Sequence, residues 1–292
     1  MIVSHVIGGL GNQMFQYATG RALSLHLDTK FLLDISDFPR YEAHQGFELQ
    51  RVFECPVGVA SEQDILGILS WQGTQLARRL LRKNAFSLVR SERFIVEPTF
   101  EYTNCLEHIY GDAYLFGYWQ SELYFARHSA AIRGDFYFKA ALSSRNAATV
   151  ELIKRVNSVS VHIRRGDYVS NRKAFSTHGV CSVEFYKEAF AWISQRTQDP
   201  VFFVFSDDMD WVRANLFVAH PCYYIDYNQG VESYNDMRLM SLCKHHIIAN
   251  SSFSWWGAWL NPNPKKIVIA PRKWFATEKN VADLLPGEWI KL

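Results

Sequence analysis

The sequence predicts an α/β protein with parallel sheets, and three observations carry this prediction. Along the second half, short apolar segments alternate with longer segments of helical periodicity. Residues 201–205 are apolar without a break, as expected of a strand that is buried on both faces of a parallel sheet. At the N-terminus, a strand, a glycine-rich loop and a helix follow one another. Such alternation is typical of parallel sheets with right-handed crossover helices.

The N-terminal segment supplies the first strand and the first helix. We expect a buried strand at residues 2–7 and a helix at residues 14–26 with one apolar face. In the loop between them, Gly9 and Gly11 match the dinucleotide-binding fingerprint, but Met14 stands where its third glycine belongs. A tight structural turn therefore explains these glycines as well as a ligand does.

Gly11, Asn12 and Gln13 are candidate cleft residues, because they stand where the first helix is expected to begin. Their backbone and amide groups could approach a ligand at that point. The alternative is structural, with Asn12 capping the helix.

The rest of the first half is expected to hold a strand at 31–34, a helix at 62–83, an aromatic strand at 114–120 and a polar helix at about 143–157. Residues 77–83 are basic and amphipathic, which suits either a solvated face or docking to an anionic membrane surface. The aromatic strand either lines a cleft or packs in the core. The polar helix suggests two domains, at 1–150 and 151–292.

The second half continues the alternation of strands and helices. The expected strands are 159–163, 201–205, 222–227, 246–249 and, as the last one, 267–270. The expected helices are 182–196, in which Ser182 is the cap, a short helix after residue 208, 233–244, and one that contains Trp255, Trp256 and Trp259.

Polar side chains gather just beyond three of these strands. They are His162, Arg164, Arg165 and Asp167 at the first strand, Asp207 at the second, and Asn250, Ser251 and Ser252 at the third. Ligands of open α/β sheets bind at the carboxyl ends of strands, and the planar guanidinium fork suits phosphate. Ser251 and Ser252 also precede a helix, where free amides favour an anion. Together these groups predict a diphosphate site, although an isolated Arg-Arg-Gly-Asp would be read as a solvated turn.

Two features allow a different interpretation. Asp207, Asp208 and Asp210 could hold a divalent metal beside the phosphates. Because the arginines already supply positive charge, we expect helix capping by part of this run and no metal. Trp255 and Trp259 could stack on a base, but their spacing of four residues favours packing in the core.

Composition limits the remaining possibilities. With 292 residues, of which 48% are hydrophobic, the chain can bury one large core or two smaller ones. A net charge of +2 argues against a general nucleic-acid binder. Five scattered cysteines lack the spacing of metal ligands and indicate a reducing compartment. The N-terminus lacks a signal-peptide pattern and no segment reaches transmembrane length, so we expect a cytoplasmic protein.

Four motifs resemble, in the same order, those of the bacterial α-1,2-fucosyltransferase family. They are Gly-Gly-Leu-Gly-Asn-Gln-Met-Phe-Gln-Tyr-Ala at 8–18, His-Ile-Arg-Arg-Gly-Asp-Tyr at 162–168, Phe-Ser-Asp-Asp at 205–208 and Asn-Ser-Ser-Phe-Ser-Trp-Trp-Gly at 250–257. The resemblance spans nearly the whole chain, and only residues 62–103 match no motif.

The resemblance implies a GT-B glycosyltransferase, in which two Rossmann-like domains face each other across a cleft. Residues 1–150 would form the acceptor side and residues 151–292 the GDP-fucose-binding domain. Such an enzyme moves L-fucose from GDP-β-L-fucose to the 2-hydroxyl of a galactose, with inversion and without a metal. No cofactor is implied, since GDP-fucose is a donor substrate. The expected acceptor is a galactose-terminated oligosaccharide, lipid-linked or free, such as an O-antigen unit. Peripheral contact with the inner membrane face is a further expectation.

The resemblance also implies roles for individual residues. The implied donor-binding residues are Arg164, Arg165, Asp207, Asp236, Asn250, Ser251, Ser252 and Phe253, with Arg164 on the diphosphate and Asp236 and Phe253 on the guanine. Asn12 of the first domain would reach the donor or the acceptor across the cleft. His162 would lie beside Arg164.

The acceptor hydroxyl must lose its proton during transfer. Asp167 and His162 are candidate bases by location, while another carboxylate, or late proton loss without a dedicated base, fits equally well. Two other functions remain as alternatives to α-1,2 transfer. One is a fucosyltransferase that forms an α-1,6-type linkage, and the other is a non-catalytic module that binds nucleotide or sugar.

Overall fold

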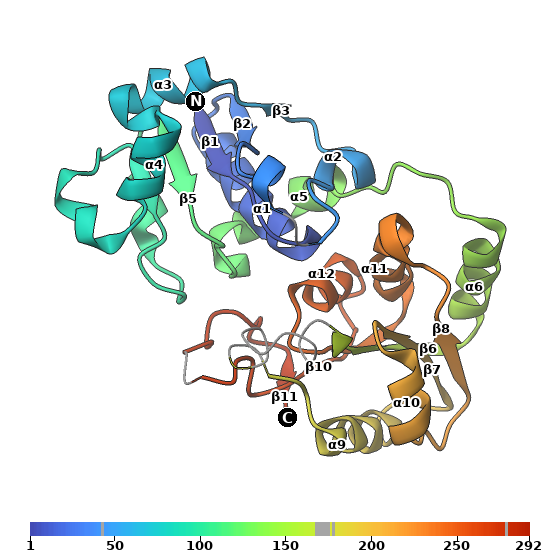
Figure 1. The fold of residues 1–292 in the computed structure, drawn as a ribbon. Coiled ribbons are helices and arrows are strands. Elements are labelled where there is room, and N and C mark those ends of the chain that lie inside the picture. The colour runs from blue at the N-terminus through green and yellow to red at the C-terminus, as the bar shows by residue number, and fades with distance from the viewer. Residues whose placement is uncertain (42–43, 167–175, 177–178, 278–279) are drawn as a thin grey trace. The chain divides into compact units, whose positions relative to one another are not determined.

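A computed structural model describes residues 1–41, 44–166, 176, 179–277 and 280–292. Two compact units make up the chain, each with its own parallel sheet (Figure 1). Unit 1 consists of Met1–Lys139 and Asn280–Pro286, and unit 2 consists of Ala140–Lys279 and Gly287–Leu292. The expected boundary at residue 150 falls inside helix α6 (Ser144–Arg155). Because Val150 and Ile153 of this helix pack on the sheet of unit 2, the helix belongs wholly to that unit.

The sheet of unit 1 has the strand order β3-β2-β1-β5-β4. Its strands are β1 (Ile2–His5), β2 (Phe31–Asp34), β3 (Gly58–Val59), β4 (Phe94–Val96) and β5 (Ala113–Phe116). All neighbouring pairs are parallel. The strands at 2–7 and 114–120 are thus shorter than expected, and β3 and β4 were not foreseen.

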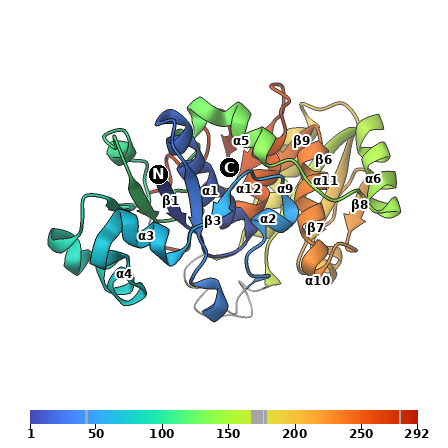
Figure 2. The ribbon, with the colours of Figure 1, turned by 90° about the horizontal axis from the view of Figure 1, so that it is seen from above.

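The helices of unit 1 cover both faces of this sheet. They are α1 (Leu10–His26), α2 (Leu49–Val52), α3 (Glu62–Leu69), α4 (Gln75–Leu81) and α5 (Ser129–Asp135). Helices α3 and α4 lie next to each other beside the sheet (Figure 2). Their side chains pack against Val3, Leu32 and Tyr114. Helix α1 approaches the sheet closely at Gly20, where a Cβ atom would lie 2.5 Å from the Phe31 ring.

The helix expected at 62–83 is interrupted. Helix α3 ends at Ser70, whose φ of 52° lies in the left-handed region, and the 3-10 turn Ser70–Gly73 separates it from α4. A Cβ atom at Gly73 would lie 2.9 Å from the carbonyl oxygen of Ile65, so the turn folds tightly back on α3. The apolar periodicity of the segment survives this break, because Ile65, Ile68, Ala77 and Leu81 all enter one core.

A buried ion pair joins α4 to the sheet. The Asp34 carboxylate, at the end of β2, pairs with the Arg78 guanidinium and accepts a 2.6 Å hydrogen bond from the Tyr114 hydroxyl. Burial raises the pKa of Asp34, but Arg78 and the hydrogen bonds outweigh this effect and hold the pKa below its usual range. Arg79 and Arg82 pair with Asp37. The basic face expected at residues 77–83 is therefore partly neutralised within unit 1.

The sheet of unit 2 has the strand order β11-β10-β9-β6-β7-β8, again wholly parallel. Its strands are β6 (Asn157–Ile163), β7 (Pro200–Ser206), β8 (Cys222–Ile225), β9 (His245–Ile247), β10 (Val268–Ala270) and β11 (Ile290–Lys291). The strand at 267–270 is not the last, because β11 pairs with it at the sheet edge.

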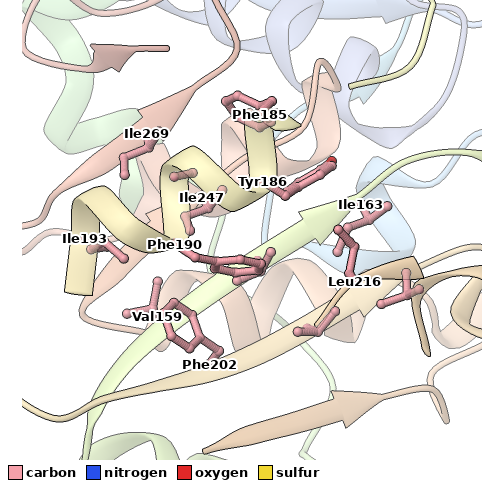
Figure 3. Close-up of a cluster of buried hydrophobic side chains, with 14 residues drawn as sticks. Val159, Ile163, Phe185, Tyr186, Phe190, Ile193, Phe202, Leu216, Ile247 and Ile269 are labelled. Carbon is pink, nitrogen blue, oxygen red and sulfur yellow. The ribbon is translucent and has the colours of Figure 1, made fainter. Parts of the chain in front are cut away.

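Alternate residues of the central strands enter two separate cores. Helices α9 (Val183–Ser194) and α10 (Met209–Asn215) pack on one face, where Val159, Val161 and Phe202 meet Phe190 (Figure 3). On the other face, Phe203 and Phe205 meet α6 and helix α11 (Tyr234–Leu242). Helix α12 (Ser252–Leu260) packs closely on α11, since a Cβ atom at Gly257 would lie 3.1 Å from Cβ of Met240. Burial of Trp255 and Trp259 confirms their expected place in the core.

The buried pair of Asp34 and Arg78 predicts a large stability effect. Asp34→Ala leaves the Arg78 charge buried without its partner, which should cost about 3–5 kcal/mol in the free energy of unfolding measured with urea. The control Asp226→Ala removes an exposed pair with Arg213, and should cost less than about 1 kcal/mol. Equal losses in the two variants would contradict the role of burial.

Candidate functional site

The strand order of unit 2 creates a switch point between β6 and β9. From β6 the chain proceeds to β7 and β8 on one side, then returns to β9, β10 and β11 on the other side. In open α/β sheets, the crevice beyond the carboxyl ends of the strands at such a point is where ligands bind. Arg164 comes directly after β6, and the N-terminus of α12 follows β9. The predicted phosphate-binding groups therefore follow neighbouring strands at the switch point.

Asp207 fixes the turn after β6. One carboxylate oxygen accepts the backbone N–H of Arg165 at 2.8 Å, and the other lies 3.1 Å from the Arg164 guanidinium. A Cβ atom at residue 166 would come within 2.9 Å of this carboxylate. Gly166 is thus needed for close approach of Asp207 rather than for a left-handed backbone. Asp207 thus holds the turn that carries Arg164, and its expected contact with the ligand stays a prediction.

The two adjacent arginines have different surroundings. The Arg165 guanidinium lies over the Trp211 ring, 3.6 Å from its centre, and pairs with Asp208 at 3.4 Å. Asp208 also accepts the Trp211 N–H as the N-cap of α10, which confirms the expected capping. These contacts make Arg165 an anchor for the turn. Arg164, with a side chain that is 26% exposed, is the arginine with access to a ligand.

His162 is buried at the end of β6, with its ring 5.9 Å from that of Phe253. Its Nδ1 atom has no hydrogen-bond partner in the described part of the chain. Burial, with the nearby Arg164 charge, lowers the pKa of His162 to about 4, although Asp207 opposes this shift. A neutral imidazole with so low a pKa is a weak base, but its open nitrogen can meet a ligand atom at the switch point.

The N-terminus of α12 presents backbone amides to the same crevice. Ser251 is the N-cap and its side chain makes no capping hydrogen bond, while Ser252 begins the helix. The first-turn amides of a helix lack partners within it and attract anions. Asn250, in contrast, is buried, and its amide donates to the carbonyl oxygens of Trp274 and Gly179. These bonds tie the segment before α12 to Gly179 and Trp274, and the expected contact of Asn250 with the donor stays a prediction.

Asp236 lies in the first turn of α11 and is partly accessible. Asn228 donates a 2.8 Å hydrogen bond to its carboxylate and exchanges two more with Asn146. Burial raises the pKa of Asp236 to about 7, against the effect of Asn228. The sequence interpretation missed Asn228 and Asn146. The position of Asn228 soon after β8 is the sequence signal that could have identified it as a site residue.

The candidate cleft residues of unit 1 divide into two kinds. The first helix begins at Leu10, earlier than expected, with Gly9 rather than Asn12 as its N-cap. Gln13 is buried, and its amide bonds to the backbone of Gly8, Gly46 and Glu48. Gln13 is therefore structural. Gly11 is also buried.

Asn12 remains a candidate for contact with a ligand, since its side chain is partly exposed. Its amide oxygen accepts a 2.7 Å hydrogen bond from Gln120, which follows β5. Strands β1 and β5 are neighbours in the unit 1 sheet, so this pair lies at the carboxyl ends of two adjacent strands. Asp167, a candidate base, lies outside the described residues.

At the carboxyl ends of the unit 2 strands, these groups are sufficient to bind an anion. The Arg164 guanidinium and the α12 amides both favour negative charge, and the Asp236 carboxylate, which accepts one hydrogen bond from Asn228, can accept others from a polar ring. Among the described residues, no group of three or more His, Cys, Asp or Glu side chains could hold a metal ion. The geometry thus suits a ligand with a diphosphate and a hydrogen-bonding base.

Comparisons with characterised proteins agree with this geometry. The chain is 36% identical to an α-1,2-colitosyltransferase of Escherichia coli over 100% of this chain and 99% of that protein. It is 35% identical to the O-antigen biosynthesis glycosyltransferase WbnK of Escherichia coli, with 98% of each chain covered. It is 32% identical to galactoside α-(1,2)-fucosyltransferase 1 of Leontocebus fuscicollis, over 35% of this chain and 28% of that protein.

Solved structures identify the fold. The α-1,6-fucosyltransferase NodZ of Bradyrhizobium, in a crystal soaked with GDP-fucose, matches with a TM-score of 0.50 at 14% identity, over 89% of this chain and 92% of NodZ. Arabidopsis thaliana FUT1 in complex with GDP matches with a TM-score of 0.51 at 12% identity, over 91% and 70% of the two chains. The chain therefore has the GT-B fold, with two Rossmann-like units.

The family model of glycosyl transferase family 11 matches residues 91–292. This match covers all of unit 2 and the end of unit 1, and the two bacterial relatives extend the likeness over the whole chain. The protein belongs to glycosyl transferase family 11.

Proposed function

We propose that the protein transfers L-fucose from GDP-β-L-fucose to the 2-hydroxyl of a galactose, with inversion and without a metal. The observation that carries this proposal is that Arg164 and the N-terminus of α12 follow adjacent parallel strands, β6 and β9, at the switch point of unit 2. The diphosphate lies there in the proposed complex. The family resemblance of the motifs and the fucosyltransferase relatives support the choice of sugar.

Arg164 stabilises the leaving group in the proposed mechanism. As the bond from the sugar to GDP breaks, negative charge accumulates on the diphosphate while the sugar acquires oxocarbenium character. A preorganised guanidinium directed at that charge lowers the barrier by several kcal/mol, as other fixed donors do. Asp207 and Gly166 keep the guanidinium in place, so little reorganisation is needed. This positive charge takes the part that a metal ion has in other transferases.

Asp236 selects guanine in the proposed complex. The base offers an N–H and an amino group side by side, and a carboxylate can accept from both. Asn228 holds one carboxylate oxygen of Asp236 in a fixed position. Phe253 lies at the start of α12 and offers its ring to the nucleotide.

The acceptor is a galactose-terminated glycan, lipid-linked or free, of the O-antigen type. The bacterial relatives act in α-1,2 transfer and O-antigen biosynthesis by name, which supports this assignment. A second candidate is colitosyl transfer, favoured by the full-length likeness to a colitosyltransferase. Colitose is L-fucose without its 3-hydroxyl group, so turnover of the two GDP-sugars side by side separates these candidates. An α-1,6-type linkage is distinguished by NMR of the product.

Arg164→Ala should lower kcat by about 10²–10³, because the developing charge on the diphosphate loses its fixed donor. Release of GDP from GDP-fucose in the presence of a galactoside measures the effect. The control Arg196→Ala removes an arginine that lies over Trp192 on α9, and should leave turnover unchanged. Near-normal turnover of a folded Arg164→Ala protein would contradict the proposed mechanism.

GDP affinity should weaken as the pH falls through 7. The Asp236 carboxylate accepts from guanine only when it is ionised, and burial raises its pKa in the free protein to about 7. Below that pH, protonation competes with GDP and the dissociation constant rises about tenfold per pH unit, whereas above it the affinity is constant. Calorimetry between pH 5 and pH 8 measures this dependence.

Asp236→Asn isolates the contribution of this one carboxyl group, because the phosphates of GDP titrate equally in both proteins. The variant should bind GDP more weakly at pH 8 and lose the part of the pH dependence that Asp236 causes. The fully exposed Asp210 provides the control variant Asp210→Asn. Identical pH profiles for Asp236→Asn and the unchanged protein would refute the assignment.

Peripheral membrane contact is part of the proposal and is assigned to a surface of unit 1. No carboxylate occurs between Asp64 and Glu92, while five basic residues do. Large exposed apolar side chains concentrate in the same segment, and together they form the apolar–basic patch. It consists of Trp71, Leu76, Leu80, Phe86, Leu88 and Val89 with Lys83 and Arg90.

The composition of the apolar–basic patch suits an anionic lipid surface. Leu88 is 99% exposed and Trp71 is 66% exposed, which gives them access to an acyl boundary. Each basic residue near an anionic leaflet contributes about 1 kcal/mol. Within the described ranges, neither Lys83 nor Arg90 forms an ion pair with a carboxylate. None of the described helices has the length and hydropathy of a membrane span.

The double variant Trp71→Ser/Leu88→Ser should lose most of its sedimentation with vesicles that contain phosphatidylglycerol, since both inserted side chains are removed. The exposed side chain of Phe217 in unit 2 supplies the control variant Phe217→Ser, which should sediment normally. High salt should weaken binding of the unchanged protein. Binding that neither the double variant nor salt reduces would contradict the assignment.

A further inference from the structure

A chain of three polar side chains links α6 to α11 within unit 2. Asn146 lies in the first turn of α6, Asn228 follows β8, and Asp236 lies in the first turn of α11. Both asparagines are buried, whereas Asp236 is partly accessible. The chain therefore leads from the interior of unit 2 to the carboxylate that the proposed nucleotide site uses.

The amide pair determines which group Asn228 presents to Asp236. Nδ2 of Asn146 donates to Oδ1 of Asn228 at 2.9 Å, and Nδ2 of Asn228 donates to Oδ1 of Asn146 at 3.1 Å. An amide NH₂ group has two donors, and Asn228 also donates to Asp236 at 2.8 Å. If Asn228 alone turned its amide over, the two oxygens would face each other, as would the two NH₂ groups. Because unmade hydrogen bonds are costly in a buried position, Asn146 keeps an N–H of Asn228 directed at Asp236.

The elements that carry these side chains are packed together. Val150 of α6 and Leu239 of α11 belong to one hydrophobic core. Tyr227, which precedes Asn228, shares a 2.7 Å hydrogen bond with the Thr149 hydroxyl on α6. The position of the Asn228 amide relative to α11 is therefore set by the same core.

The charged form of Asp236 depends on this amide. No Lys or Arg forms an ion pair with Asp236 in the part of the chain that the structure describes. Burial raises the pKa of Asp236 to about 7, and the hydrogen bond from Asn228 opposes that shift. The titratable group near it is Tyr227, whose pKa is raised by burial first and by Asp236 in smaller part, while Arg145 lies over the Tyr227 ring.

The two protonation states of Asp236 match different purines. An ionised carboxylate offers two acceptors, which suit the adjacent N–H and amino groups of guanine. A protonated carboxyl group offers one donor and one acceptor, which suit the ring nitrogen and the amino group of adenine. The side chain that binds guanine when it is charged can therefore bind adenine when it is neutral.

We propose that Asn228, held in place by Asn146, selects guanine over adenine by keeping Asp236 ionised. Both asparagines are positioning residues, since they act through Asp236. This inference rests on the proposed binding of GDP at Asp236. In the unchanged protein, the ratio of the ADP to the GDP dissociation constant should fall about tenfold for each unit by which the pH is lowered. Titration of the phosphates cancels in this ratio, because both nucleotides carry a diphosphate.

Asn228→Leu removes the donor and replaces it with an apolar side chain of similar size. A hydrogen bond to a charged group contributes about tenfold or more, so the pKa of Asp236 should rise by about one unit. At pH 7, the ratio of the ADP to the GDP dissociation constant, measured by calorimetry, should therefore fall about tenfold. GDP should bind more weakly and ADP more tightly than to the unchanged protein.

A second variant guards against a loss of folding. Asn228→Leu leaves the buried Asn146 amide without this partner, whereas Asn146→Leu/Asn228→Leu replaces both amides and should change the selectivity in the same way. The control Gln229→Leu removes an exposed amide that donates to the backbone of Asp226, and should leave the ratio unchanged. An unaltered ratio in both folded variants would overturn the inference. If the unchanged protein does not prefer GDP to ADP at pH 8, the proposed GDP site itself has failed instead.

Discussion

The Asp207 carboxylate holds the turn after β6 in one conformation, and the candidate donor site depends on that turn. Two donors of successive residues, the charged Arg164 guanidinium and the neutral backbone N–H of Arg165, converge on it. Without this carboxylate, neighbouring cations at a strand end would repel each other and lose their orientation. Gly166 makes the approach sterically possible, and Trp211 holds the second arginine aside. The result is one oriented guanidinium after β6, the neighbour of the strand that leads into α12.

The second constraint is the burial of a carboxyl group that has no cationic partner among the described residues. One such carboxyl group occurs in each unit. Asp236 and Glu97, which directly follows β4, both have a pKa raised to about 7 because burial disfavours their charged forms. In contrast, Asp34 is buried beside Arg78 and keeps its pKa low. The structural carboxylate is thus paired, while Asp236 and Glu97 accept hydrogen bonds from neutral amides. Because these neighbours are neutral, the negative charge of each of the two carboxylates remains available to a ligand.

Much of the fold followed from local patterns in the sequence. The apolar run at 201–205 and the strand–helix alternation around it predicted parallel sheets, because a strand buried on both faces admits no polar side. The sequence predicted one helix at 62–83 and missed the break at Ser70. The apolar periodicity continues across this turn, because residues on both sides of it enter the same core. Short edge strands such as β3 and β11 carry too few residues to show periodicity.

The sequence predicted where the candidate site lies, but not the different contacts that its individual residues make. Polar residues after strands predicted the carboxyl edge of unit 2, yet only packing shows that Arg165 and Asn250 support the loops. Asn146 escaped notice because a single amide in a polar helix has no motif. Its significance depends on its contact with Asn228, which lies 82 residues further along the chain.

The central claim is that the switch point of unit 2 holds the diphosphate of an activated sugar. A crystal structure of the protein with bound GDP tests it most directly. The account predicts phosphate oxygens against the Arg164 guanidinium and the amides at the start of α12, with guanine at Asp236. A diphosphate bound away from Arg164 and Ser252 would contradict it.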